Sequence, residues 1–122
     1  MIGRRVDGVA ILSFGGEETL IDIFRGCNVP VFVIDTDSPR FLRTVRIDYQ
    51  QRIRQAVQHL AALGHVRIAF ISGPARLKTA AMRKNAFQEC MEEIGLEVSP
   101  EMLVQGDHTM EAGMEATSAV IV

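Results

Sequence analysis

A charged residue lies on the apolar side of a predicted helix spanning residues 79–94. At 3.6 residues per turn, Arg83 falls in the middle of an apolar stripe, and Thr79 lies one turn earlier on the same side. A buried guanidinium without partners is costly, and the helix dipole disfavours a cation in the first turns. Arg83 therefore either reaches into a crevice to hold a polar ligand, or snorkels or pairs with a nearby carboxylate. The stripe consists of Ala86, Phe87, Cys90, Met91 and Ile94.

Further polar residues follow the predicted strands, each at the point where a strand ends. Each is weak alone, because a serine there can form a turn, an aspartate can begin a loop and another aspartate can cap a helix. Together, two carboxylates, an arginine, two hydroxyls and an imidazole could hold a polyhydroxylated or heterocyclic small molecule. These candidate ligand-binding residues are Ser13, Asp35, Asp48, Thr79, Arg83 and His108.

The elements that must position these residues alternate between strand and helix. Apolar runs predict five strands, at 9–12, 31–34, 44–47, 68–71 and 102–104, of which the first looks buried on both faces. Between them lie a short helix at 19–25, a helix after Asp48 and the helix with Arg83, and a fourth helix begins near Met110. This alternation favours a right-handed parallel α/β fold, in which ligands bind outside the carboxyl ends of the strands.

The ends of the helices carry the expected signals. Asp48 and Thr109 are placed to cap the helices that follow them, and Gly64 and Gly95 suit the left-handed residue beyond a helix end. The helix after Asp48 has an apolar stripe of Ile53, Ala56, Val57, Leu60 and Leu63.

Composition excludes several classes of protein. The 122 residues are 48% hydrophobic and 23% charged, with a net charge of −2, so neither disorder nor a general attraction to nucleic acid is expected. No run approaches the roughly 18 apolar residues of a membrane span. Cys27 and Cys90 have no metal-ligand spacing and indicate free thiols in a reducing cytoplasm. The absence of a dinucleotide, phosphate-loop or nucleophile-elbow motif argues against an enzyme, and neither a metal nor a cofactor is expected.

An ordered series of segments resembles the effector-binding core of the lactose/galactose repressor family of bacterial transcription regulators. That family has a periplasmic-binding-protein-like α/β fold with two Rossmann-like subdomains and a small-molecule pocket between them. The most telling segment is HLAALGHVRIAFISGP at 59–74. The others are VDGVAI at 6–11, VPVFVID at 29–35, VRIDY at 45–49, MRKNAFQECMEEIGL at 82–96 and VQGDHTMEAGMEA at 104–116.

The resemblance implies roles for individual residues. Arg83 matches the family's arginine that contacts a sugar or purine effector, and Thr79 and Asp35 match positions that line the same pocket. Asp48 falls where the chain would cross between subdomains. His108 replaces the aromatic residue that often stacks on the ligand, which permits a hydrogen bond instead.

The resemblance also implies an organisation. Residues 1–47 would belong to the DNA-proximal subdomain and residues 48–122 to the distal one. The chain would be a fragment of the sensing core of a cytoplasmic, homodimeric repressor, without the headpiece that contacts operator DNA. Such a piece is expected to expose apolar surface and to bind effector weakly or not at all. The alternatives are the substrate-binding protein of a sugar transporter and, less favoured, a doubly wound enzyme.

Overall fold

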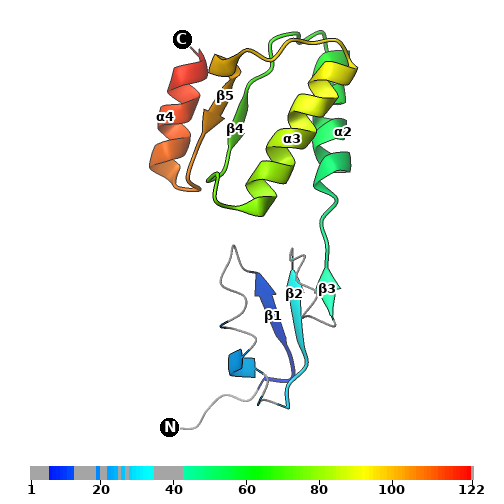
Figure 1. Cartoon of the computed structure of the whole chain (residues 1–122), viewed down its shortest axis with the longest axis vertical. Helices are drawn as coiled ribbons and strands as arrows, with labels where there is room; N and C mark the ends of the chain where they lie inside the picture. Colours follow the sequence, from blue (N-terminus) through cyan, green and yellow to red (C-terminus); the bar gives the residue numbers. More distant parts are fainter. Residues whose placement is uncertain are drawn as a thin grey trace. The chain divides into compact units, whose positions relative to one another are not determined.

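The chain divides into two compact units, Met1–Ile47 and Asp48–Val122, which are described separately (Figure 1). The computed structural model describes residues 6–12, 19, 22–24, 26, 28–34 and 43–121. Ser13 and Asp35, two of the candidate ligand-binding residues, and Cys27 lie outside this part of the chain.

The first unit contains a parallel sheet of three strands, β1 (Val9–Leu12), β2 (Val31–Ile34) and β3 (Thr44–Val45), in the order β1-β2-β3. The register pairs Val9 with Val31 and Val33 with Thr44. Residues 19 and 22–24 are helical, within the range predicted for a helix. The parallel arrangement and the first two strands are therefore as predicted, whereas the third strand ends two residues earlier than expected.

Strand β1 was predicted to be buried on both faces, and that prediction was wrong. Its residues alternate between half-buried and exposed, and Leu12 is 59% exposed. The described residues of the unit cover one face of the strand only, so half of its apolar side chains face outward. A continuous apolar run is typical of a strand with both faces buried, but the sequence does not say which segment packs on the second face.

The second unit contains a pair of parallel strands with helices on both sides. In Figure 1 the order across the unit is α4, β5, β4, α3 and α2. The two strands pair Phe70 with Leu103 and Ser72 with Gln105. The elements, in chain order, are α2 (Tyr49–Ala62), β4 (Phe70–Ser72), α3 (Lys78–Glu93), the 3-10 turn η1 (Pro100–Met102), β5 (Leu103–Gln105) and α4 (Met110–Ile121).

The helices agree with the sequence prediction to within one residue, but the strands begin later than predicted. Strand β4 starts at Phe70 rather than at residue 68, and β5 starts at Leu103 because Pro100 begins a 3-10 turn that includes Met102. Proline is favoured at the first position of such a turn, where its fixed φ fits and no N–H is needed. The apolar run therefore predicted the strand, but not where its extended backbone begins.

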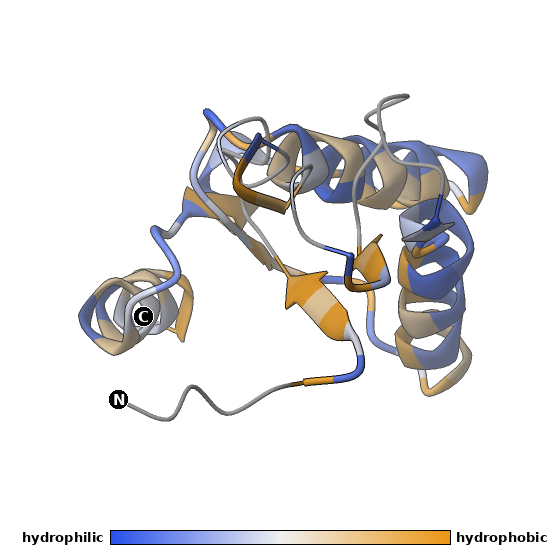
Figure 2. Cartoon of the chain, turned by 90° about the horizontal axis from the view of Figure 1, so that it is seen from below, coloured by the Kyte–Doolittle hydropathy of each residue, from blue (hydrophilic) through white to orange (hydrophobic). Residues whose placement is uncertain are grey.

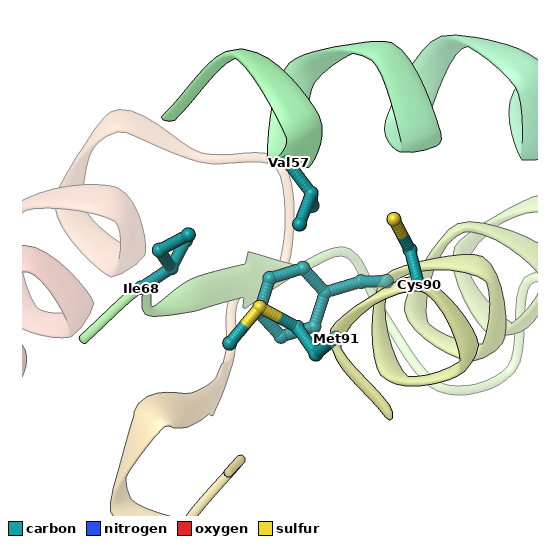
Figure 3. Packing of buried hydrophobic residues seen from close by; sticks show 5 residues of the cluster. Val57, Ile68, Cys90 and Met91 are labelled. Atoms are coloured by element: carbon teal, nitrogen blue, oxygen red, sulfur yellow. The ribbon is translucent and has the colours of Figure 1, made fainter. Parts of the chain in front are cut away.

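The core of the second unit lies where α2 and α3 meet the sheet. The five buried residues are Val57, Ile68, Phe87, Cys90 and Met91, four of which Figure 3 shows with labels. The ring of Phe87 stacks on Phe70, with centroids 5.0 Å apart. The apolar stripe predicted for the helix with Arg83 is confirmed, because four of its five residues are buried. Cys90 is a free thiol whose pKa is raised by burial.

The stripe predicted for α2 is only partly buried. Val57 is 3% exposed, whereas Leu60 is 36% and Leu63 is 63% exposed. In Figure 2 the helices of this unit show both apolar and polar residues along their length. The contacts of α2 with α3 come from Gln50, Arg54 and Val57, and the described part of the chain leaves the apolar residues of the last turn of α2 uncovered. The predicted apolar stripe is therefore buried at Val57 but exposed at these two leucines.

Polar contacts fix the ends of the helices and join α2 to α3. Gln51 N donates to Asp48 Oδ1 at 2.9 Å, and Ala112 N donates to Thr109 Oγ1 at 3.2 Å, so both predicted caps are confirmed. Gly64 and Gly95 have φ values of 88° and 73°, as predicted for helix ends. Between the helices, Arg54 forms a two-pronged ion pair with Glu93, and Gln50 Nε2 donates to Glu89 Oε2 at 3.2 Å.

No helix in the described part of the chain is both long and apolar enough to cross a bilayer.

Candidate functional site

A cavity of about 290 Å³ lies at the carboxyl ends of β4 and β5, entirely within the second unit. This is the edge of a parallel sheet at which ligands characteristically bind. Its walls combine apolar side chains with polar groups from the two loops that follow the strands. The lining residues are Ile53, Phe70, Ile71, Ser72, Gly73, Arg83, Gly106, Asp107, His108, Thr109 and Gly113.

Arg83 lines this cavity from the second turn of α3 and is half-buried. Its Nε donates to the carbonyl oxygen of Thr79 at 3.1 Å, and its Cζ lies 5.1 Å from the centroid of the Tyr49 ring. Among the described residues, no carboxylate forms an ion pair with this guanidinium. Of the two readings left open by the sequence, the contacts therefore favour a cation that faces a cavity over one paired with a neighbouring acid.

His108 lines the cavity from the loop that follows β5 and packs closely against Gly73 of the loop after β4. A Cβ atom built at Gly73 would lie 2.5 Å from Cε1 and 2.6 Å from Nε2 of the imidazole. Such distances are far below a normal contact, so only glycine lets the ring occupy this place. The backbone of His108 has a φ of 70°, a left-handed conformation that histidine adopts more readily than most residues.

Asp107 and Thr109 fix the loop that carries His108. Asp107 Oδ1 accepts a hydrogen bond from Thr109 N at 2.8 Å and another from Thr109 Oγ1 at 2.5 Å. These hydrogen bonds, and to a lesser degree the charge of His108, lower the pKa of the Asp107 carboxyl below its usual range. Asp107 is therefore ionised at neutral pH and places a negative charge beside the cavity that Arg83 lines.

Only some of the candidate ligand-binding residues from the sequence line the cavity. Arg83 and His108 are brought together in the cavity. Asp48 and Thr79 do not line it: Asp48 caps α2, and Thr79 holds Arg83 through its backbone carbonyl. Ser13 and Asp35 lie outside the described residues.

Sequence reasoning missed several lining residues, above all Ser72, Gly73 and Asp107. Each of the three ends a strand or follows one within two residues, so the rule that located His108 could have located them too. The apolar floor formed by Ile53, Phe70 and Ile71 could not be found in this way, because such residues look like ordinary core.

The arrangement suits reversible binding of a small polar molecule. A guanidinium and a carboxylate provide fixed charges, an imidazole and hydroxyl groups provide further hydrogen bonds, and the apolar floor can accept the flat face of a ring. In the described part of the chain, no group of three or more His, Cys, Asp or Glu residues could hold a metal ion. The second unit is therefore a parallel α/β fold with a polar cavity at the carboxyl edge of its sheet.

Residues 2–122 match the family model described as periplasmic binding proteins and sugar binding domain of the LacI family. The chain belongs to this family, which confirms the predicted periplasmic-binding-protein-like fold. It is similar to catabolite control protein A of Priestia megaterium, with 32% identity over 99% of this chain and 37% of that protein. It is also 32% identical to the HTH-type transcriptional repressor PurR of Glaesserella parasuis, over 99% of this chain and 36% of that protein.

Among solved structures, it resembles the transcriptional regulator CelR in complex with cellobiose, with a TM-score of 0.72 and 30% identity. The alignment covers 98% of this chain and 37% of the CelR chain. The chain thus spans little more than a third of the length of these relatives, of which PurR is named a transcriptional repressor and CelR a transcriptional regulator.

Proposed function

We propose that this chain is part of the effector-sensing core of a bacterial transcription regulator, and that its cavity contacts a sugar or a purine-like molecule. The observation that carries the proposal is that Arg83 and His108 line one cavity at the carboxyl ends of β4 and β5. Membership of the LacI family and the regulators among its relatives support the same function.

The chemistry of the cavity supports a ligand that is polar at its rim and apolar on one face. The Arg83 guanidinium can donate two parallel hydrogen bonds to neighbouring oxygen or nitrogen acceptors, such as two adjacent hydroxyls or the edge of a purine. Phe70 and Ile71 can contact the apolar face of a sugar ring or the plane of a base. Asp107 accepts hydrogen bonds, and His108 can donate or accept one. The family resemblance adds Asp35, and its position at the end of a predicted strand adds Ser13, as further candidate ligand contacts from the first unit.

The proposed mechanism is a shift of population between two arrangements of the sensing core. An effector that contacts both units favours one relative orientation and thereby changes the spacing of two DNA-binding headpieces in a homodimer. On this proposal the first unit is the DNA-proximal subdomain and the second the distal one. Operator DNA is contacted by parts of a cytoplasmic protein outside these 122 residues. Binding of cellobiose by CelR makes a disaccharide the first effector to test.

Calorimetric titration of the intact protein tests this function, with cellobiose and guanine as first probes. We expect one of these classes to bind, and Arg83→Ala to abolish binding while leaving the thermal transition in place. Arg83→Lys is the matched control, because it keeps the charge but loses the two-pronged geometry, and it should bind at intermediate strength. Unchanged affinity of Arg83→Ala would show that the cavity arginine is structural and would contradict the proposal.

Operator binding separates a regulator from the binding protein of a transporter. Gel-shift titration of the intact protein with DNA from its own promoter region should show an effector-dependent change in affinity. A protein that binds the sugar but no DNA would support the transporter alternative instead.

A further inference from the structure

We infer that Tyr49 is a positioning residue for the cavity arginine: its aromatic ring holds the Arg83 guanidinium in the orientation that receives the ligand. This inference rests on the proposed function, because it assigns Tyr49 a part in the same site. Tyr49 itself does not line the cavity and comes from α2, whereas Arg83 comes from α3.

The need for such a residue follows from the chemistry of arginine. Its side chain has several rotatable bonds, and a ligand that must immobilise it loses affinity. The hydrogen bond from Nε to the carbonyl of Thr79, at 3.1 Å, fixes one edge of the guanidinium but permits rotation about that contact. The Tyr49 ring, with its centroid 5.1 Å from Cζ, supplies a second contact on a different side. Neither of these two contacts uses the hydrogen-bond donors of the terminal Nη groups.

The ring is itself held in a defined place. Tyr49 is the first residue of α2, next to the Asp48 cap that closes the start of the helix. Helix α2 is fastened to α3 by the contacts of Arg54 with Glu93 and of Gln50 with Glu89. Val57 of α2 also belongs to the same buried cluster as Phe87 and Cys90 of α3, so the ring and the guanidinium are carried by two helices that pack together.

The contact uses the face of the ring and not its hydroxyl, because a cation is attracted to the negative face of an aromatic ring. Phenylalanine at position 49 should therefore preserve the effect and leucine should lose it. For a half-buried pair, loss of the contact should weaken ligand binding by about 3- to 10-fold, given the usual strength of cation–π pairs.

The first arm of the test needs no ligand. In the intact protein, the Nε–Hε signal of Arg83 is followed by NMR in the wild type, Tyr49→Phe and Tyr49→Leu. We expect ring-current displacement and slowed exchange of this signal in the wild type and in Tyr49→Phe, and loss of both in Tyr49→Leu. Thermal unfolding confirms that the variants are folded. An Arg83 signal that is unchanged in Tyr49→Leu overturns the inference whether or not the protein is a sensor.

The second arm is a double-mutant cycle on affinity for cellobiose or guanine, whichever the wild type binds. If Tyr49 acts through Arg83, Tyr49→Leu weakens binding in the wild-type background and has no further effect in Arg83→Ala. An equal loss in both backgrounds would overturn the inference, because Tyr49 would then act on the ligand or the fold directly. Binding of neither probe class would count against the proposed function, while the first arm would still decide whether Tyr49 positions Arg83.

Discussion

Replacing Gly73 with alanine should move His108 without unfolding the protein. The added Cβ would meet Cε1 and Nε2 of the imidazole at 2.5 and 2.6 Å, and Ala80 Cβ at 3.4 Å. The distance to Ala80 Cβ is close to that of an ordinary van der Waals contact, so the backbone can remain in place. The imidazole is the far end of a rotatable side chain, and it must give way.

The size of the movement follows from these distances. Carbon atoms in contact are usually about 3.5 to 4.0 Å apart, so the ring has to retreat by about 1 Å or adopt another rotamer. Gly73 does not have a positive φ, so alanine can adopt its backbone conformation. At such a position, replacing glycine with alanine stabilises the folded protein by about 0.4 to 1 kcal/mol, because the unfolded chain has less conformational freedom. We therefore expect little change in stability, together with a loss of about 5- to 10-fold in ligand affinity if His108 contributes one hydrogen bond.

The assay follows the Hε1 and Cε1 resonances of His108, together with thermal unfolding and ligand titration. Gly113→Ala is the matched control: Gly113 also lines the cavity, but a Cβ there meets nothing within 4 Å. The control should stabilise α4, by about 1 kcal/mol, and leave the His108 resonances in place. The reasoning is refuted if His108 is unmoved in Gly73→Ala, or if both variants move it equally.

Three further outcomes are expected. Phe87→Ala should destabilise the protein by about 3 to 5 kcal/mol in urea unfolding, because it empties the centre of the core, and a loss below 1 kcal/mol would contradict the packing described. Asp48→Ala should cost about 1 kcal/mol in the same assay, whereas Asp48→Ser, which keeps a capping oxygen, should recover most of it. The pKa of Glu93 is lowered chiefly by its hydrogen bond with Arg54, and that of Asp107 by Thr109. Since both folded-state pKa values lie below the unfolded ones, their stabilisation is present above about pH 4.5 and is lost as the pH falls through the folded values. A midpoint of unfolding that is constant from pH 6 to pH 3 would argue against this contribution.

The sequence was informative where one residue type has only a few physical solutions. A cation inside an apolar helical stripe identified Arg83, and a polar residue after a strand identified His108. Helix ends followed from Asp48, Thr109, Gly64 and Gly95, because each of these residues supplies a cap or a left-handed backbone at little cost.

Contacts between segments far apart in the chain were not predictable from one sequence. Nothing in the residue pattern says that the ring of Tyr49 meets Arg83, or that His108 occupies the space left open by Gly73. Periodicity likewise marks one side of α2 as apolar without saying how far α3 extends along it, so the exposure of Leu60 and Leu63 was missed. Such information requires the three-dimensional arrangement of the helices and loops.

The left-handed backbone of His108 has a consequence for anyone who would engineer this protein. A residue other than glycine in that backbone conformation lowers the stability of the folded protein by about 1 kcal/mol. His108→Gly should therefore raise the melting temperature while removing an imidazole from the cavity. Selection for heat resistance alone would thus favour variants whose cavity lacks this imidazole, and a library of variants should be screened for stability and for ligand binding at once.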